Sequence, residues 1–243
     1  MKRGVIFDKD GTLLDFEAFW LPVTGGALNE LAHKFCVSEQ AVRAAEEKLG
    51  ISGGRAERNG VLCAGTYAQM AEIVREVFSE YGTEAAEREM YREVCRAFEE
   101  NMHRGEILPS SAHLKDTLLA LKKEDYRLFV ATTDNAGITA ACLQKLGIEG
   151  LFDGVYTDGA GYPAKPDPFI IDMIVKEHGA EREGLAMVGD TRTDLFFARR
   201  GRILGIGYAQ NEREKRLLAP LADEVIGDFC ELPEILKRRI CVC

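Results

Sequence analysis

The segment at residues 4–15, which reads GVIFDKDGTLLD, constrains the fold of this chain more than any other segment. Residues 5–7 form a short apolar run, which is typical of a strand that is buried on both faces. Asp8 and Asp10 follow directly. Residues two apart in an extended chain point the same way, so their carboxylates are predicted to lie together. The glycine and threonine at positions 11 and 12 favour a tight turn with free backbone N–H groups.

Two carboxylates this close repel each other and cannot both stay ionised unaided. A divalent cation or one shared proton would resolve the conflict. The end of a buried strand is also where ligands bind in open α/β sheets. The segment therefore predicts a ligand site or a metal site, and the alternative is a β-turn with incidental acidic residues.

The composition limits the kinds of partner. The chain has 243 residues, enough for one large domain or two modest ones, and its formal net charge is −9. Such an acidic surface argues against nucleic acid or an anionic membrane as the main partner, although it still allows a local positive site for a phosphate group. No signal peptide precedes the first strand and no apolar run could span a membrane, so we expect a cytoplasmic protein.

Seven cysteines are present, at positions 36, 63, 95, 142, 230, 241 and 243, and they include no Cys-x-x-Cys pair. Most of them lie in apolar helical patterns, so we expect them to be reduced and buried. Cys241 and Cys243 form a Cys-x-Cys tail, for which we predict no function.

Residues 16–105 are predicted to form a separate helical block. Apolar residues recur there at three- and four-residue spacing, which is the pattern of helices with one buried face. Ser38 and Thr66 are suited to cap two of these helices. Residues 50–65 contain five glycines and are predicted to form a long loop, and long loops in compact domains are usually functional or disordered. Because no strand pattern stands out, we predict an all-helical domain inserted after the first strand.

From residue 106 onward, strands and helices are predicted to alternate. The predicted strands are residues 127–132, 151–156, 185–188, 203–206 and 224–226, and the predicted helices cover 114–121, a segment ending at 145, 168–178, 193–200 and 232–239. This alternation predicts a parallel sheet with right-handed crossovers. We therefore predict an α/β fold. Residues 1–15 and 106–243 would form a Rossmann-like parallel sheet core with helices on both faces, and residues 16–105 the inserted all-helical domain.

Thr132 and Thr133 follow a predicted strand and precede a helix. A hydroxyl group there can bind a phosphate oxygen, and the helix N-terminus adds free N–H groups and a favourable dipole. Thr132 is the preferred candidate. Capping of the helix by Thr133, Asp134 or Asn135 is the alternative.

Two later segments carry charged residues in a similar setting. Lys165 lies in a Lys-Pro-Asp-Pro run, whose prolines forbid regular structure and hold the lysine in a fixed loop. An ammonium group held there can neutralise both a phosphate and a nearby aspartate. Asp190 follows another apolar strand, in a Gly-Asp-x-x-x-Asp run that ends at Asp194. Mg²⁺ prefers such hard oxygen ligands, and N-capping of a helix by Asp194 is the alternative reading.

These four segments resemble, in order, the four motifs of the haloacid dehalogenase (HAD) superfamily of phosphotransferases. Asp8-x-Asp10-Gly-Thr resembles motif I, Thr132 motif II, Lys165 motif III, and Gly-Asp190-x-x-x-Asp194 motif IV. Lys9 fills a variable position of motif I, and every core position fits the pattern. The resemblance also implies that residues 16–105 are a helical C1 cap, as in phosphoglycolate phosphatase-like enzymes.

The resemblance implies a role for each matching residue. Asp8 would be the nucleophile that forms an aspartyl-phosphate, and Asp10 would be first the general acid and then the base. Mg²⁺ would be bound by Asp8, Asp190, the backbone carbonyl of Asp10 and, directly or through a water molecule, Asp194. The phosphate would be held by Thr132, Lys165 and the N–H groups near Gly11 and Thr133.

The resemblance thus implies a Mg²⁺-dependent phosphomonoesterase that is similar to phosphoglycolate phosphatase and acts on a small phosphorylated metabolite. The alternatives are a haloacid dehalogenase, against which Asp10 argues, a sugar phosphomutase of β-phosphoglucomutase type, and a non-catalytic binding module. In the cap, Arg55 and Arg58, together with His33 and Trp20, are candidates for contacting the leaving group. Ordinary surface roles are the alternative for all four, and the oligomeric state is not predicted.

Overall fold

The computed structural model describes residues 2–58, 60–158 and 161–240, so the tail with Cys241 and Cys243 lies outside the described residues. The chain divides into two compact units. One comprises Met1–Asp15 and Ile107–Cys243 and is called here the core unit, and the other comprises Phe16–Glu106 and is called the inserted unit. No helix among the described residues is long and apolar enough to cross a bilayer.

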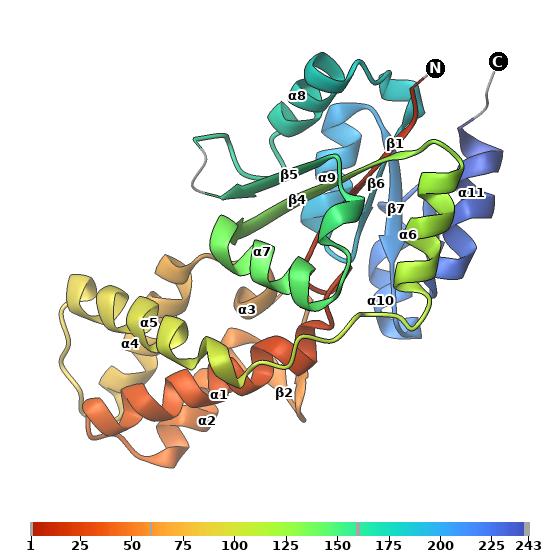
Figure 1. The fold of residues 1–243 in the computed structure, drawn as a ribbon. Helices are drawn as coiled ribbons and strands as arrows, with labels where there is room; N and C mark the ends of the chain where they lie inside the picture. Colours follow the sequence, from red (N-terminus) through yellow and green to blue (C-terminus); the bar gives the residue numbers. More distant parts are fainter. Residues whose placement is uncertain (1, 59, 159–160, 241–243) are drawn as a thin grey trace. The chain divides into compact units, whose positions relative to one another are not determined.

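The core unit is built on a six-stranded sheet (Figure 1). Its strands are β1 (Gly4–Phe7), β4 (Arg127–Asn135), β5 (Gly154–Asp158), β6 (Leu185–Gly189), β7 (Leu204–Tyr208) and β8 (Glu224–Ile226). Their order is β5-β4-β1-β6-β7-β8, and every neighbouring pair is parallel. The predicted parallel sheet is confirmed. The strands that follow β1 in sequence extend first to one side of it and then to the other, which makes β1 the switch point of the sheet.

Helices cover both faces of this sheet, as predicted. They are α6 (Leu114–Lys123), α7 (Ala136–Lys145), α8 (Phe169–His178), α9 (Arg192–Gly201), α10 (Glu212–Leu218) and α11 (Leu232–Arg239). Successive side chains of a strand point to opposite faces. Val5 and Phe7 therefore pack with α6 and α11 on one face, while Ile6 packs with α8 and α9 on the other. A strand covered in this way has no solvent side, which explains its uninterrupted apolar run.

The end of α9 differs from the prediction. The sequence pattern ends this helix before Gly201, but the helix includes Gly201, and Arg202 takes the left-handed conformation with a φ of 54°. A Cβ atom on Gly201 would collide with the side chain of Ile171 on α8. Gly201 is therefore a point of close helix packing rather than a helix stop. Helix α10 has no counterpart in the sequence-based prediction.

The inserted unit is mainly helical. Its helices are α1 (Phe16–Lys34), α2 (Glu39–Leu49), α3 (Val61–Ala64), α4 (Tyr67–Glu80) and α5 (Glu87–Asn101), followed by a 3₁₀ turn at Met102–Arg104. Helices α1 and α4 each pack against both α2 and α5. Thr66 caps α4 in a capping box with Gln69, as predicted, whereas Ser38 stands at the N-cap of α2 without a side-chain hydrogen bond.

The expectation of an all-helical insertion needs one correction. Part of the segment predicted as a loop forms a small antiparallel hairpin, β2 (Ile51–Ser52) paired with β3 (Arg55–Ala56), and another part forms α3. Gly53 and Gly54 connect the two strands with φ values of 58° and 72°. Two consecutive residues with positive φ are what the favoured two-residue hairpin turn requires, and glycine adopts them without strain. Strands of two residues are too short to show an alternating pattern in the sequence.

The expectation that most cysteines are buried is wrong for the described residues. Cys142 is buried, Cys63 and Cys95 are half-buried, and Cys36 and Cys230 are exposed, and all five are free thiols. The apolar pattern around a cysteine predicts a helix, but it does not decide on which face of that helix the cysteine lies.

Candidate active site

The paired aspartates follow the central strand directly. The backbone N–H of Asp8 donates to the Val188 carbonyl at 2.9 Å, which prolongs the pairing of β1 with β6 by one residue. The chain then turns back, because the N–H groups of Leu13 and Leu14 both donate to the Lys9 carbonyl at 2.9 Å. Gly11 has a φ of 85° in this turn, a conformation that favours glycine. In this turn Asp8 is only 7% exposed.

The N–H of Gly11 donates to the Leu14 carbonyl at 2.8 Å within this turn. The binding of phosphate by N–H groups near Gly11 stays a prediction.

Lys165 joins an aspartate that follows β1 to an aspartate in the first turn of α9. Its Nζ lies 2.6 Å from Oδ1 of Asp8 and 2.6 Å from Oδ1 of Asp194, and its side chain is almost fully buried. Burial acts to lower the pKa of Lys165, but Asp194 and Asp8 outweigh it and raise that pKa above its ordinary value. Lys165 is therefore a charged ammonium group, placed between the carboxylates that the sequence singles out.

Asp190 and Asp194 belong to the end of β6 and the start of α9. Oδ1 of Asp190 accepts a hydrogen bond of 3.1 Å from the hydroxyl of Thr12. Oδ2 of Asp194 accepts from the hydroxyl and the N–H of Thr191, which forms a capping box at the start of α9. The N-cap of α9 is thus Thr191 rather than Asp194, which takes part as the third residue of the helix in the capping box. The other carboxylate oxygen of Asp194 reaches Lys165. Thr12 is a contributor to the site that the sequence reading did not single out.

The three carboxylates fit a divalent cation. Asp8, Asp190 and Asp194 are buried and offer oxygen atoms within 4.8 Å of one another. Burial raises the pKa of Asp8 well above its ordinary value of 3.8, and although Lys165 opposes this, Asp194, Asp190 and Asp10 raise it further. One ammonium group does not balance three ionised carboxylates, so added positive charge would stabilise the cluster. Hard carboxylate oxygens are the donors that Mg²⁺ prefers.

Asp10 forms an ion pair with Lys9. Nζ of Lys9 lies 2.7 Å from Oδ1 of Asp10 and 3.1 Å from Oδ2 of Asp134, and the Lys9 side chain is 0% exposed. The sequence assigns Lys9 to a variable motif position and predicts no role for it. In the structure Lys9 is a buried cation with two carboxylate partners. Nothing in a local pattern indicates that residues 9 and 134 meet.

The two threonines at the end of β4 differ in exposure. Thr132 is buried and its Oγ1 accepts from the N–H of Asp134 at 3.1 Å, whereas Thr133 is exposed. Asn135 caps α7, since its side chain accepts from the N–H of Ile138 at 2.9 Å. Of the capping residues considered from the sequence, Asn135 is therefore the one used. Thr132 remains the candidate for phosphate.

The four residues of the inserted unit that are candidates for contacting the leaving group differ in their exposure. Arg55 on β3 and His33 on α1 are exposed. Arg58 is 7% exposed, and its guanidinium group lies 5.5 Å from the centre of the Phe16 ring. Trp20 is also buried and packs on Phe16 and Phe19. An ordinary surface role is thus wrong for Arg58 and Trp20, because both help to build the inserted unit.

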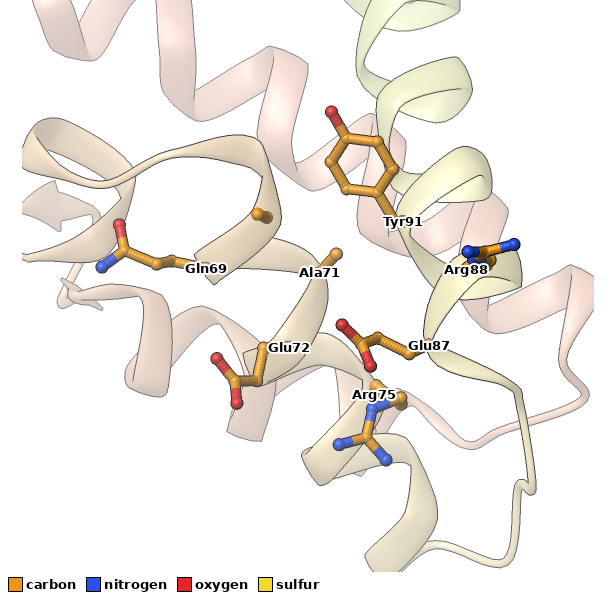
Figure 2. A pocket seen from close by; sticks show the side chains of 8 residues that line it. Gln69, Ala71, Glu72, Arg75, Glu87, Arg88 and Tyr91 are labelled. Carbon is orange, nitrogen blue, oxygen red and sulfur yellow. The ribbon is translucent and has the colours of Figure 1, made fainter.

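A cavity of about 450 Å³ also lies in the inserted unit, between α4 and α5. Figure 2 shows Glu72 and Arg75 of α4 near Glu87 of α5, with Tyr91 further along the same helix. The lining also includes Ala68, Gln69, Ala71 and Arg88. Arg55 and Arg58 are not part of it, and its mixed charges select no single class of ligand.

A second group of possible metal ligands, His113, Asp228 and Cys230, has a structural explanation. Oδ1 of Asp228 accepts from the N–H of Cys230 at 2.8 Å and lies 2.9 Å from Nδ1 of His113, while Oδ2 accepts from the hydroxyl of Ser111. Asp228 also caps the short helix Phe229–Glu231. Both carboxylate oxygens of Asp228 are thus used in contacts that join residues 111–113 to residues 228–230 within the core unit.

A parallel sheet with buried aspartates and a lysine beyond the carboxyl ends of its central strands defines an α/β enzyme with a charged site at the switch point of the sheet. The family model described as "Hydrolase: haloacid dehalogenase-like hydrolase" matches residues 2–202. The chain belongs to this family.

Individual relatives agree with this assignment. The chain is 26% identical over 238 residues to a phosphoglycolate phosphatase of Photobacterium profundum, covering 97% of this chain and 96% of the relative. The structure of a HAD phosphatase from Thermococcus onnurineus superimposes with a TM-score of 0.65 at 22% identity, over 97% of this chain and 98% of the other. A protein from Thermotoga maritima assigned as a β-phosphoglucomutase gives 0.65 at 20% identity, over 97% and 99%. At such identities the two structures show a common fold alone.

Proposed function

We propose that this protein is a Mg²⁺-dependent phosphomonoester hydrolase that works through an aspartyl-phosphate on Asp8. Its substrate would be a small phosphorylated metabolite, as for phosphoglycolate phosphatase. The observation that carries the proposal is the buried Asp8 carboxylate, which lies against Lys165 in a cluster with Asp190 and Asp194. A second carboxylate, Asp10, stands two residues further on and is paired with Lys9. The family membership and the phosphatase names of the relatives support the same reaction class.

The chemistry divides into two displacements at phosphorus. In the first, a carboxylate oxygen of Asp8 attacks the phosphorus, the bond to the ester oxygen breaks, and Asp10 gives its proton to the departing alkoxide. In the second, Asp10 takes a proton from a water molecule as that water attacks the phosphorus. The bond to Asp8 breaks, inorganic phosphate leaves, and both aspartates return to their starting states.

The remaining residues would hold the substrate and the metal ion. The ammonium group of Lys165, the hydroxyl of Thr132 and the N–H of Thr133 would bind phosphoryl oxygens. Asp8, Asp190, Asp194 and the backbone carbonyl of Asp10 would hold Mg²⁺. The ion, when bound, supplies the positive charge that lets an anionic nucleophile and an anionic phosphate share one site.

The inserted unit would act as the cap that selects the substrate. A substrate with a carboxylate, such as phosphoglycolate, would favour an arginine donor. Arg55 is the better candidate of the two arginines, because it is exposed on a hairpin while Arg58 is buried beside Phe16. A matched pair of variants, Arg55→Gln and Arg43→Gln, tests this, since Arg43 is an exposed arginine on α2 of the same unit. Arg55→Gln alone should change the relative rates within a substrate panel.

A panel of phosphorylated metabolites assayed for release of inorganic phosphate tests the proposal as a whole. Phosphate release from at least one member, lost in Asp8→Asn, is the expected result. The likeness to the Thermotoga maritima protein keeps a sugar phosphomutase as the second candidate. Isomerised sugar phosphate without free phosphate would favour that candidate and contradict hydrolysis.

A further inference from the structure

Lys9 is a buried cation to which the proposed chemistry gives no task. Its side chain is 0% exposed and contacts two carboxylates, Asp10 at 2.7 Å and Asp134 at 3.1 Å. Lysine is almost never fully buried unless it is paired, because removing an ammonium group from water is costly. In the sequence, Lys9 stands directly between the proposed nucleophile and the proposed general acid. Its complete burial at this position therefore needs an explanation.

Asp134 is anchored independently of Lys9. Its backbone N–H donates to Oγ1 of Thr132 at 3.1 Å, and its Oδ1 accepts from the N–H of Asn135 at 2.8 Å. Its other oxygen, Oδ2, is the one that reaches Lys9. The carboxylate of Asp134 is thus fixed on its own strand end, and Lys9 spans from there to Asp10.

The charges in this group favour a permanent bridge. Burial acts to lower the pKa of Lys9, but Asp10 and Asp134 raise it above the ordinary value, so the ammonium form persists. Burial raises the pKa of Asp134, and Lys9 opposes that rise. Burial raises the pKa of the Cys142 thiol on α7, which the charges of this group also influence, to about 11, so the thiol remains neutral.

We propose that Lys9, held in place by Asp134, is a positioning residue that fixes the carboxyl group of Asp10 for proton transfer. The inference rests on the proposed function, because it presumes that Asp10 is the general acid and base. A lysine side chain is flexible, so one contact with Asp10 would fix little. A second contact with an anchored carboxylate removes that freedom, and proton transfer depends on such alignment within hydrogen-bonding distance.

The bridge also links two parts of the site. Asp134 and Thr132 are joined by a hydrogen bond at the end of β4, and Lys9 and Asp10 belong to the turn after β1. The bridge thereby fixes the position of the Asp10 carboxyl group, which would donate the proton, relative to the Thr132 hydroxyl, which would bind the phosphate. This function requires no contact between Lys9 and the substrate.

Lys9→Met tests the inference, because it keeps the length of the side chain and removes the ammonium group. With an alkyl phosphate, kcat should fall by about 10²-fold, the scale of loss for a misplaced catalytic group, while KM changes little. With p-nitrophenyl phosphate, whose leaving group needs little protonation, formation of the phosphoenzyme should fall much less. Aspartyl-phosphate should accumulate on Asp8, since the second step needs Asp10 as a base.

Asp134→Asn is the second variant, and it keeps Lys9. It should show the same dependence on the leaving group with a smaller fall in kcat. The double variant should be no slower than Lys9→Met, because both changes break the same bridge.

Lys122→Met is the matched control. The ion pair of Lys122 with Asp153, at 2.8 Å, lies in the same unit but outside the site, so the kinetics of this variant should match those of the unaltered protein.

Circular dichroism and thermal unfolding show whether each variant is folded. If Lys9→Met does not fold, Asp134→Asn still tests the inference. Equal losses with alkyl and p-nitrophenyl phosphates, or additive effects in the double variant, would overturn the inference, as would unchanged turnover in Lys9→Met. Failure of the proposed function would look different. The unaltered protein itself would then release no phosphate from any panel substrate.

Discussion

Replacing Lys165 with methionine should destabilise the core unit. Methionine fills similar space and removes the ammonium group, whose ion pairs with Asp8 and Asp194 both measure 2.6 Å, with the lysine side chain only 4% exposed. Removing one partner of a buried ion pair typically costs about 3–5 kcal/mol, since the remaining charge is left uncompensated. At pH 7, without added metal ion, we expect the free energy of unfolding to fall by an amount in that range.

The loss should shrink as the pH is lowered. Burial raises the pKa of Asp8 well above its ordinary value of 3.8, and Lys165 is the group that opposes this rise. Without Lys165, folded Asp8 keeps its proton up to a higher pH than the unfolded chain does, so stability falls as the pH rises above the unfolded value. The difference between the variant and the unaltered protein should therefore be smaller at pH 5 than at pH 7.

Urea unfolding at both pH values, followed by circular dichroism, measures the effect. Hydrogen exchange of amides in β1 and β6 isolates the core unit, because the two units can unfold separately. Lys122→Met serves as the control, since its ion pair with Asp153 is partly exposed and should be worth less than about 1 kcal/mol. If Lys165→Met costs no more than Lys122→Met, or if its cost grows at lower pH, the argument from buried charge is wrong.

Three further predictions concern the site and the inserted unit. Asp8→Asn should abolish phosphoenzyme formation. Asp10→Asn should slow turnover of alkyl phosphates by about 10²–10⁴-fold and spare the first step with p-nitrophenyl phosphate. Rapid quench with labelled substrate, followed by peptide mapping, should place the labelled phosphate on Asp8, and label on any other residue refutes the assignment. Activity should disappear in EDTA and return with Mg²⁺, and full turnover with metal absence verified by elemental analysis would contradict the proposed dependence. Hydrogen bonds from Lys34 and Arg96 lower the pKa of Glu93 from 4.5 to about 2, so its contribution to stability should be fully present above pH 4.5 and lost as the pH falls toward 2. Thermal unfolding should show this acid-dependent loss weakened in Glu93→Gln but not in Glu76→Gln, an exposed carboxylate on α4.

The sequence was sufficient for features that depend on neighbouring residues. The apolar run of β1 predicts a strand covered on both faces, and the helix of α11 and the strand of β8 begin and end where their patterns indicate. Thr66 caps α4 because the capping box is a local motif, with its two partners three residues apart. The assignment of Asp8, Asp10, Thr132, Lys165, Asp190 and Asp194 to one reaction stays a proposal, although the sheet brings their segments to neighbouring strand ends.

The tertiary structure decided what depends on contacts between distant segments. Lys9 meets Asp134, and Gly201 packs closely against Ile171, although these pairs are far apart in sequence. The same holds for the burial of Arg58 beside Phe16 and for the exposure of Cys36 and Cys230. A periodic pattern records which face of a segment avoids water, because burial repeats with the geometry of a helix or strand. It carries no record of which residue lies opposite a given side chain, since that is set only when the elements pack together.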